Sequence, residues 1–181
     1  MALTSTLRRF RIDLSDIERS LYRDFDLRVA QHPSESETYM LTRLFAYLLS
    51  FEEGLVFAPG LCTDDEPAVF VRDPANGGFK KWIEIGNPSS RRLHKASKAC
   101  ASVSIYTYKD PVNLVREFEG EKVHRLETIR AYALQPGFLS QLTQTLARDN
   151  TWTVFRQEGD LTVVVGEESF SSAVAEISLS G

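Results

Sequence analysis

The sequence predicts a mixed α/β fold, because segments with the two-residue period of β-strands alternate with segments at helical spacing. The strand-like runs are short and are separated by proline and glycine, which mark turns. A chain of 181 residues, 43% of them hydrophobic and 25% charged, is long enough to bury a core. We therefore expect one domain over residues 1–181.

The first 32 residues have the alternating pattern of two strands. Phe10, Ile12 and Leu14 alternate with charged residues, and the same alternation returns between Phe25 and Val29. Because successive side chains of a strand point to opposite faces, each of these strands has one face in water. The pattern predicts an N-terminal antiparallel strand pair.

A change of period after this pair predicts a helix over about 35–51. Apolar residues recur at helical spacing over Met40–Leu48. Ser34 is the predicted N-cap, and Glu37, three residues later, completes a capping box. Gly54 is expected to end the helix.

The middle of the chain continues with short β-prone runs and a second, basic helix. The runs are separated by proline and glycine, and a serine can cap the helix that follows them. The predicted order from residue 35 is helix, strand, strand, strand, helix, strand. In sequence the segments after the first helix are strands at 55–63, 67–73 and 79–88, a helix at 90–102, and a strand at 103–109.

The last third of the chain predicts further mixed structure. A short helix, a strand and another helix come first, followed by a β-hairpin turned at residues 158–160 and a last strand. The expected bounds are helix 111–120, strand 127–135, helix 136–149, hairpin 151–165 and strand 173–179.

Composition limits the function classes. The net charge of −4 and a pI near 5.5 give no overall field that attracts nucleic acid, so any phosphate contact has to be local. No stretch has the roughly 18 to 20 apolar residues that a membrane helix needs, and the N-terminus does not resemble a secretory signal, so we expect a cytoplasmic protein without a membrane partner. Cys62 and Cys100 lie far apart, without the spacing of a zinc site or a disulfide framework.

One charge falls inside an apolar strand. In the segment KKWIEIGNP, residues 80–88, alternation places Trp82, Glu84 and Gly86 on one face and the two isoleucines on the other. A carboxylate in a half-buried strand needs a partner or a chemical role. Glu84 is therefore predicted to be either paired or functional.

Four separated segments occur in the order found in a known family. They are AQHPSE (30–35), GLCTDDEP (60–67), WIEIGNP (82–88) and RRLHKA (91–96). On these segments the whole chain resembles the bacterial YaeQ family. Members of that family resemble the PD-(D/E)XK nuclease superfamily, so the resemblance implies a restriction-endonuclease-like core with the helix, three strands, helix, strand order described above.

The resemblance also implies a site for Mg²⁺-dependent phosphodiester hydrolysis. Such chemistry needs hard oxygen ligands for the metal and a cation near the phosphate oxygens. The implied metal ligands are Glu84 with Asp65 or Glu66, and Glu35 is the implied helix acid. Lys95 is the implied catalytic cation, in place of a lysine that would fall two residues after Glu84.

Two positions depart from the superfamily pattern. Ala68 follows the proline of DDEP, where relatives usually carry a carboxylate. Gly86 stands where the motif lysine would fall. Because both departures remove a functional group, they favour a chain that has lost the reaction.

Two function classes therefore stay open, a Mg²⁺-dependent nuclease-like enzyme and a non-enzymatic module that binds nucleic acid or a protein through the same cleft. In the second case Glu84 would form a structural ion pair with Lys95 or Arg91, and Arg91, Arg92 and Lys98 would contact the phosphate backbone. A metabolic enzyme unrelated to phosphate has no supporting motif, since the sequence contains no GxGxxG, P-loop, GxSxG or HExxH. The acidic run before Pro67 and the two acids near residue 35 also have structural explanations, as a solvated turn and a helix start.

Overall fold

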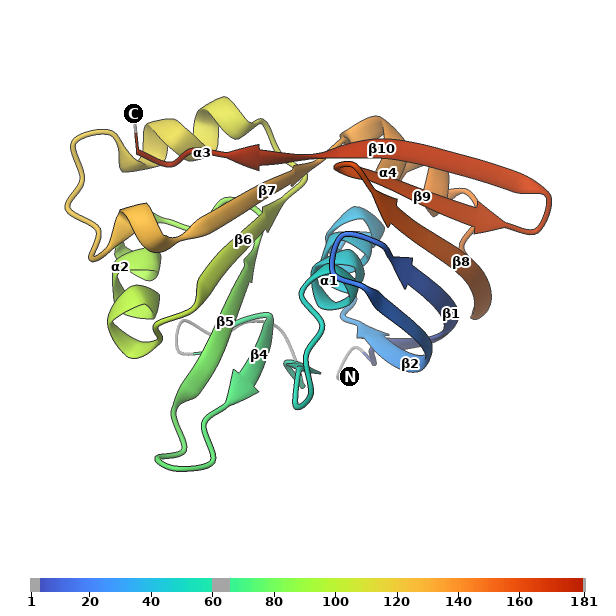
Figure 1. Ribbon diagram of the computed structural model, residues 1–181, viewed down its shortest axis with the longest axis horizontal. Coiled ribbons are helices and arrows are strands. Elements are labelled where there is room, and N and C mark those ends of the chain that lie inside the picture. The colour runs from blue at the N-terminus through green and yellow to red at the C-terminus, as the bar shows by residue number, and fades with distance from the viewer. Residues whose placement is uncertain (1–3, 60–65, 181) are drawn as a thin grey trace.

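The computed structural model describes residues 4–59 and 66–180 and confirms the mixed α/β class (Figure 1). Its strands form one ten-stranded sheet of order β2-β1-β8-β9-β10-β7-β6-β5-β4-β3. The strands are β1 (Thr6–Asp16), β2 (Leu21–Gln31), β3 (Val56–Phe57), β4 (Val69–Arg72), β5 (Phe79–Ile85), β6 (Val103–Thr107), β7 (Arg130–Leu134), β8 (Asp149–Gln157), β9 (Asp160–Val165) and β10 (Glu168–Ile177). The helices are α1 (Glu37–Leu49), α2 (Ser90–Ala99), α3 (Pro111–Phe118), α4 (Pro136–Thr143) and a 3-10 turn at Leu126–Thr128.

The sheet bends around α1, which lies inside the arch (Figure 1). Every residue of α1 from Met40 to Leu49 is buried, and the helix contacts β2, β4, β5, β6 and α4. A helix that is apolar on all sides has to be covered on all sides. The curvature of the sheet provides that cover, and α1 is the centre of the larger hydrophobic core.

The start of α1 differs from the sequence prediction. Its N-cap is Ser36, whose hydroxyl accepts a hydrogen bond from the backbone N–H of Tyr39. Ser34 instead contacts the ring of His32, and the carboxylate of Glu37 pairs with an arginine of β1. The predicted capping box is therefore wrong, because both of its side chains have other partners.

The segment from α1 to β6 contains a crossover that covers the second face of the sheet. β3, β4 and β5 run antiparallel in succession, and α2 then returns the chain so that β6 lies parallel to β5. Ile83 and Ile85 pack into the core around α1, whereas Trp82 packs with Leu93 of α2 and Ile105 of β6. The predicted division of β5 into two faces is confirmed.

The terminal segments are joined in a way that the sequence pattern does not show. β1 pairs with β2 antiparallel and, on its other side, with β8 parallel. β10 begins at Glu168, earlier than expected, since it pairs with β9 across a turn at Gly166 before it reaches β7. α4 ends at Thr143 and is shorter than the predicted helix. Within 4–59 and 66–180, no helix has the length and apolar character needed to cross a membrane.

Candidate functional site

Glu84 lies on the face of β5 that α2 covers. Its side chain is buried, and its Oε1 accepts a hydrogen bond of 2.6 Å from the indole N–H of Trp82. The same oxygen accepts a hydrogen bond of 2.8 Å from Nε of Arg92, which forms a buried ion pair with it. Glu84 is therefore paired, and its partner is Arg92 rather than the predicted Lys95 or Arg91.

Arg92 links three parts of the chain. Its backbone N–H donates to the side chain of Ser89, the N-cap of α2, and this fixes the residue in the first turn of the helix. Its Nη2 donates to the backbone carbonyl of Glu66 at 2.8 Å, while Nε holds Glu84. The guanidinium group thus fastens the start of α2 to β5 and to the segment that enters β4.

A cavity of about 310 Å³ lies at the start of α2. The described residues that line it are Ser89, Arg91, Arg92 and Lys95. Three of these four side chains are cationic, and they lie at a helix N-terminus, where the helix dipole also favours negative charge. Among the described residues, this is a local concentration of cationic side chains in a chain of net charge −4. Lys98, in the last turn of α2, is exposed but does not line the cavity.

The other predicted acids lie apart from Glu84. The carboxylate of Glu66 pairs with Arg72 at 3.1 Å, although its backbone carbonyl contacts Arg92. Glu35 pairs with Arg43 of α1, on the opposite face of the sheet from α2, and accepts a hydrogen bond from the backbone N–H of His32. Burial raises the pKa of Glu35, and Arg43 opposes that shift. Asp65 lies outside the described residues.

Ala68 and Gly86 have structural roles at the two positions that depart from the superfamily pattern. Gly86 ends β5 with φ of +83°, a left-handed conformation that disfavours any residue with a Cβ. A lysine at that position would therefore be strained. Ala68 is buried in the core, and its N–H donates to the carbonyl of Ile83.

The described oxygen atoms around Glu84 do not fit the coordination that Mg²⁺ requires. Mg²⁺ requires near-octahedral oxygen coordination. The two oxygens that converge here, Oε1 of Glu84 and the carbonyl of Glu66, already accept hydrogen bonds from Arg92. Within residues 4–59 and 66–180, no cluster of three or more histidine, cysteine or acidic residues could hold a metal ion.

Comparison with known proteins places this geometry in a family. The family model described as "YaeQ protein" matches residues 1–174. The chain belongs to the YaeQ family. The uncharacterized protein YaeQ of Escherichia coli (strain K12) is 40% identical over 108 residues, which span 60% of this chain and 59% of that relative. The uncharacterized protein YaeQ of Salmonella typhi is 30% identical over 160 residues, 88% of each chain.

Two crystal structures of YaeQ proteins have the same fold. The protein from Xanthomonas axonopodis pv. citri is 27% identical, with a TM-score of 0.86 over 96% of this chain and 97% of that one. The protein from Pseudomonas syringae is 29% identical, with a TM-score of 0.82 over 98% of this chain and 97% of that one. The curved sheet around α1 is therefore shared with these two YaeQ proteins.

Sequence reasoning missed the two residues that hold Glu84 in this YaeQ-family chain. The sequence analysis placed Trp82 on the same strand face as Glu84 without pairing the two, although a separation of two residues allows the indole N–H to reach the carboxylate. Arg92 was expected to contact phosphate. The side chain of Arg92 points toward Glu84 because of the way α2 packs on β5. The spacing of residues within α2 or within β5 does not predict that packing.

Proposed function

We propose that this YaeQ-family chain binds the phosphate backbone of a nucleic acid at the cavity at the start of α2. The observation that carries the proposal is that Arg91, Arg92 and Lys95 line one cavity at a helix N-terminus. Phosphate contacts by Lys and Arg supply most of the affinity of non-specific nucleic-acid binding. A local site of this kind suits a protein whose overall charge is negative.

The arrangement around Glu84 supports binding rather than hydrolysis. Arg92 bonds to Glu84 and to the carbonyl of Glu66, so a fixed cation lies at the oxygens that a catalytic metal would use. The order of α1, β3, β4, β5, α2 and β6 supports, within the same proposal, a restriction-endonuclease-like core. In this chain Glu84 holds Arg92 in place, and Arg91 and Lys95 meet the phosphates.

The binding test compares variants at equal salt. A short fluorescently labelled DNA duplex and a single strand are titrated with wild-type protein, and anisotropy reports binding. The double variant Arg91→Gln/Lys95→Gln is expected to bind about tenfold or more weakly, because each removes a charge-assisted phosphate contact. Lys98→Gln, on the same helix but outside the cavity lining, is expected to bind almost as well as wild type.

A matched control removes two exposed arginines from the opposite end of the sheet. Arg11→Gln/Arg28→Gln changes the net charge by the same amount on β1 and β2, away from α2. Equal losses in the two double variants would show that only net charge matters and would contradict the α2 site. If neither nucleic acid binds the wild type, the nucleic-acid proposal fails and a protein partner becomes the explanation for the basic surface.

A second candidate function is Mg²⁺-dependent phosphodiester hydrolysis, which the order of elements from α1 to β6 favours and which would require the metal to displace Arg92 from Glu84. A resident metal would raise the melting temperature by mass action, and Glu84→Gln would abolish that rise. Under the binding proposal, millimolar Mg²⁺ or Mn²⁺ produces no rise that depends on Glu84. A metal-induced rise that is lost in Glu84→Gln would favour the enzyme.

A further inference from the structure

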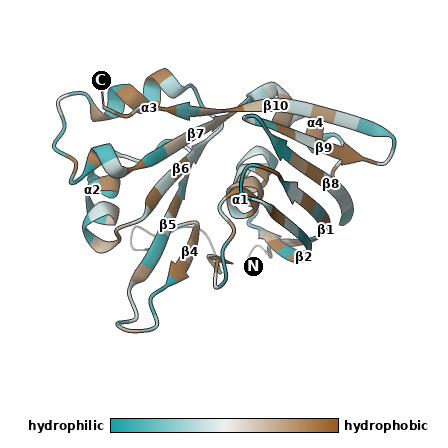
Figure 2. Cartoon of the chain, in the orientation of Figure 1, coloured by the Kyte–Doolittle hydropathy of each residue, from teal (hydrophilic) through white to brown (hydrophobic). Residues whose placement is uncertain are grey.

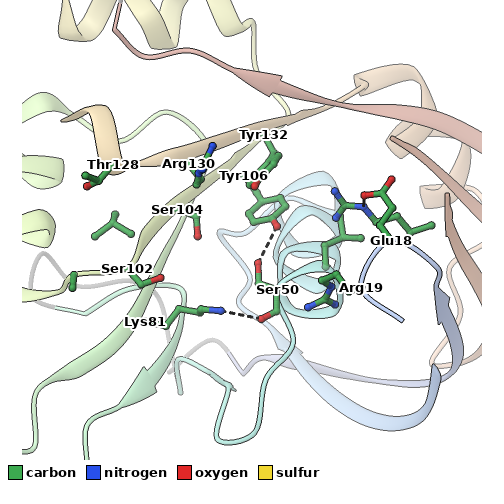
Figure 3. Close-up of a pocket in the computed structure, with 14 residues that line it drawn as sticks. Glu18, Arg19, Ser50, Lys81, Ser102, Ser104, Tyr106, Thr128, Arg130 and Tyr132 are labelled. Carbon is green, nitrogen blue, oxygen red and sulfur yellow. Dashed lines mark hydrogen bonds and ion pairs between the residues drawn. The ribbon is translucent and has the colours of Figure 1, made fainter. Parts of the chain in front are cut away.

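A larger cavity of about 600 Å³ lies on the inner face of the sheet, across β5, β6 and β7 from α2. Its walls are the strands β5, β6 and β7 on one side, and the β1–β2 turn with Glu18 and Arg19 on the other (Figure 3). Ser50, just after the end of α1, lies between these walls. Cavities of this size bind small ligands.

The strand wall of this cavity is polar because the strands extend past the end of α1. On β6, Ser104 and Tyr106 line the cavity together with Ser102, which precedes the strand. Val103 also borders the cavity but packs, like Ile105, in the core under α2. Figure 2 shows that the first part of β5 is likewise hydrophilic. Strand alternation thus gives one apolar face for α2 and one polar face for the cavity.

Two of the cavity's cations bond to the end of α1 and are themselves ion-paired, Arg19 with Asp16 and Lys81 with Glu52. Arg19 donates to the carbonyls of Leu48 and Phe51, and Lys81 donates to the carbonyl of Ser50. The C-terminal end of a helix carries partial negative charge on its unpaired carbonyls. Because these carbonyls are paired with cations, the end of α1 does not repel an anion in the cavity.

The cavity's two other cations keep hydrogen-bond donors for a ligand. Arg130 uses Nη1 in an exposed ion pair with Glu176, and Arg156 uses Nε in a pair with Glu18. In the part of the chain that the structure describes, these are the only side-chain hydrogen bonds of either guanidinium group. An exposed pair such as Arg130–Glu176 contributes little, so a ligand anion competes with it readily.

Several hydroxyl groups of the cavity also have capacity for a ligand. Tyr106 and Ser50 bond to each other at 2.9 Å, and the ring of Tyr106 stacks on Tyr132 with centroids 5.0 Å apart. The hydroxyls of Ser102, Ser104 and Tyr132 make no hydrogen bond to any described residue. Figure 3 shows Ser102 and Ser104 on the wall between Lys81 and Arg130.

We propose that this cavity binds a sugar phosphate, with its phosphate paired to Arg130 and its hydroxyl groups bonded to Ser102 and Ser104. A guanidinium fork matches phosphate geometry, and serine hydroxyls both donate to and accept from sugar hydroxyls. Arg156, which uses only Nε for Glu18, offers further N–H donors from another side of the cavity. The ligand is either a free sugar phosphate or a nucleotide, since both carry this chemistry.

Isothermal titration calorimetry of the full chain tests the site with three probes: inorganic phosphate, ribose 5-phosphate and adenosine monophosphate. Ribose 5-phosphate is expected to bind more tightly than inorganic phosphate. Arg130→Gln is expected to weaken its binding about tenfold, and Ser104→Ala severalfold. Arg9→Gln, which removes an arginine from another exposed ion pair on β1, is the matched control and is expected to have no effect.

Each outcome decides between sources of the ligand or overturns the site. Tighter binding of adenosine monophosphate than of ribose 5-phosphate identifies a nucleotide, and equal binding identifies the free sugar phosphate. Equal affinity for inorganic phosphate and its esters would overturn the sugar assignment, and no binding of any probe would overturn the site. Melting temperatures of the variants are measured in parallel, and Arg91→Gln/Lys95→Gln, which leaves this cavity intact, separates a failure here from a failure at α2.

Discussion

The buried ion pair between Glu84 and Arg92 predicts strong energetic coupling between the two residues. Side-chain exposure is 5% for Glu84 and 17% for Arg92, so solvent screens the pair only weakly. Arg92→Leu leaves a buried carboxylate whose charge is no longer balanced, and breaking a buried pair in this way costs about 3 to 5 kcal/mol. Because Trp82 still donates to Glu84 and Arg92 is not fully buried, we expect a loss of about 3 kcal/mol.

A double-mutant cycle isolates the coupling. Glu84→Gln keeps an oxygen that accepts from Trp82 and Arg92 and loses only the charge, so it should cost about 1 kcal/mol. In Glu84→Gln/Arg92→Leu no charge is buried, and the double variant should therefore be more stable than the sum of the two single losses predicts, by about 1 to 2 kcal/mol. Urea unfolding followed by circular dichroism gives each free energy of unfolding. Losses that add to within about 0.5 kcal/mol would refute the pairing.

Two further predictions concern residues near the cavities. Burial raises the pKa of Tyr106 from 10.0 to about 12, so the folded chain keeps the hydroxyl protonated where the unfolded chain ionises it. The resulting stability is complete below about pH 10 and is lost as the pH rises toward 12; at about pH 11.5 the loss is about 2 kcal/mol. Urea unfolding at about pH 9 and about pH 11.5 should show this loss in wild type and in the control Tyr22→Phe, which alters an exposed tyrosine. Tyr106→Phe should lose less stability between the two pH values. Equal losses in all three proteins would contradict the assignment of the loss to Tyr106. Gly86→Ala should lower the free energy of unfolding by about 1 kcal/mol because φ at this position is +83°. The control Gly137→Ala, in the first turn of α4 with open space around it, should not destabilise the chain. Equal effects of the two substitutions would argue against strain at Gly86.

The sequence predicted the elements well where a period was long and regular. The alternation of Phe10, Ile12 and Leu14 corresponds to β1, and the apolar positions from Met40 onward correspond to α1. The faces of β5 followed from alternation alone, since Trp82 packs toward α2 and Ile83 toward α1. These features depend on local periodicity, which a sequence displays directly.

Features that depend on packing between distant segments were not predictable. The parallel pairing of β1 with β8 joins residues about 140 positions apart, and neither strand's pattern specifies the other. The predicted N-cap of α1 was wrong for a local reason. Ser34 and Ser36 are equally good caps by residue type, but only the hydroxyl of Ser36 accepts from the N–H of Tyr39.

The candidate sites show the same limit. That Glu84 is either paired or functional followed from its place in an apolar strand, but the choice of Arg92 over Lys95 depends on how α2 lies on β5. The cavity on the inner face was not anticipated, although polar residues at 102, 104 and 106 alternate with Val103 and Ile105. Its walls come from the β1–β2 turn, the end of α1 and three strands, which only the folded chain brings together.

The salt dependence of nucleic-acid binding tests the central claim most directly. If Arg91 and Lys95 each neutralise a phosphate, the slope of log K against log salt should fall by about 1.8 for duplex DNA in Arg91→Gln/Lys95→Gln, since each contact contributes about 0.9. The slope for Arg11→Gln/Arg28→Gln should stay at the wild-type value. An unchanged slope in the α2 variant would show that the cavity at the start of α2 does not hold the phosphate backbone.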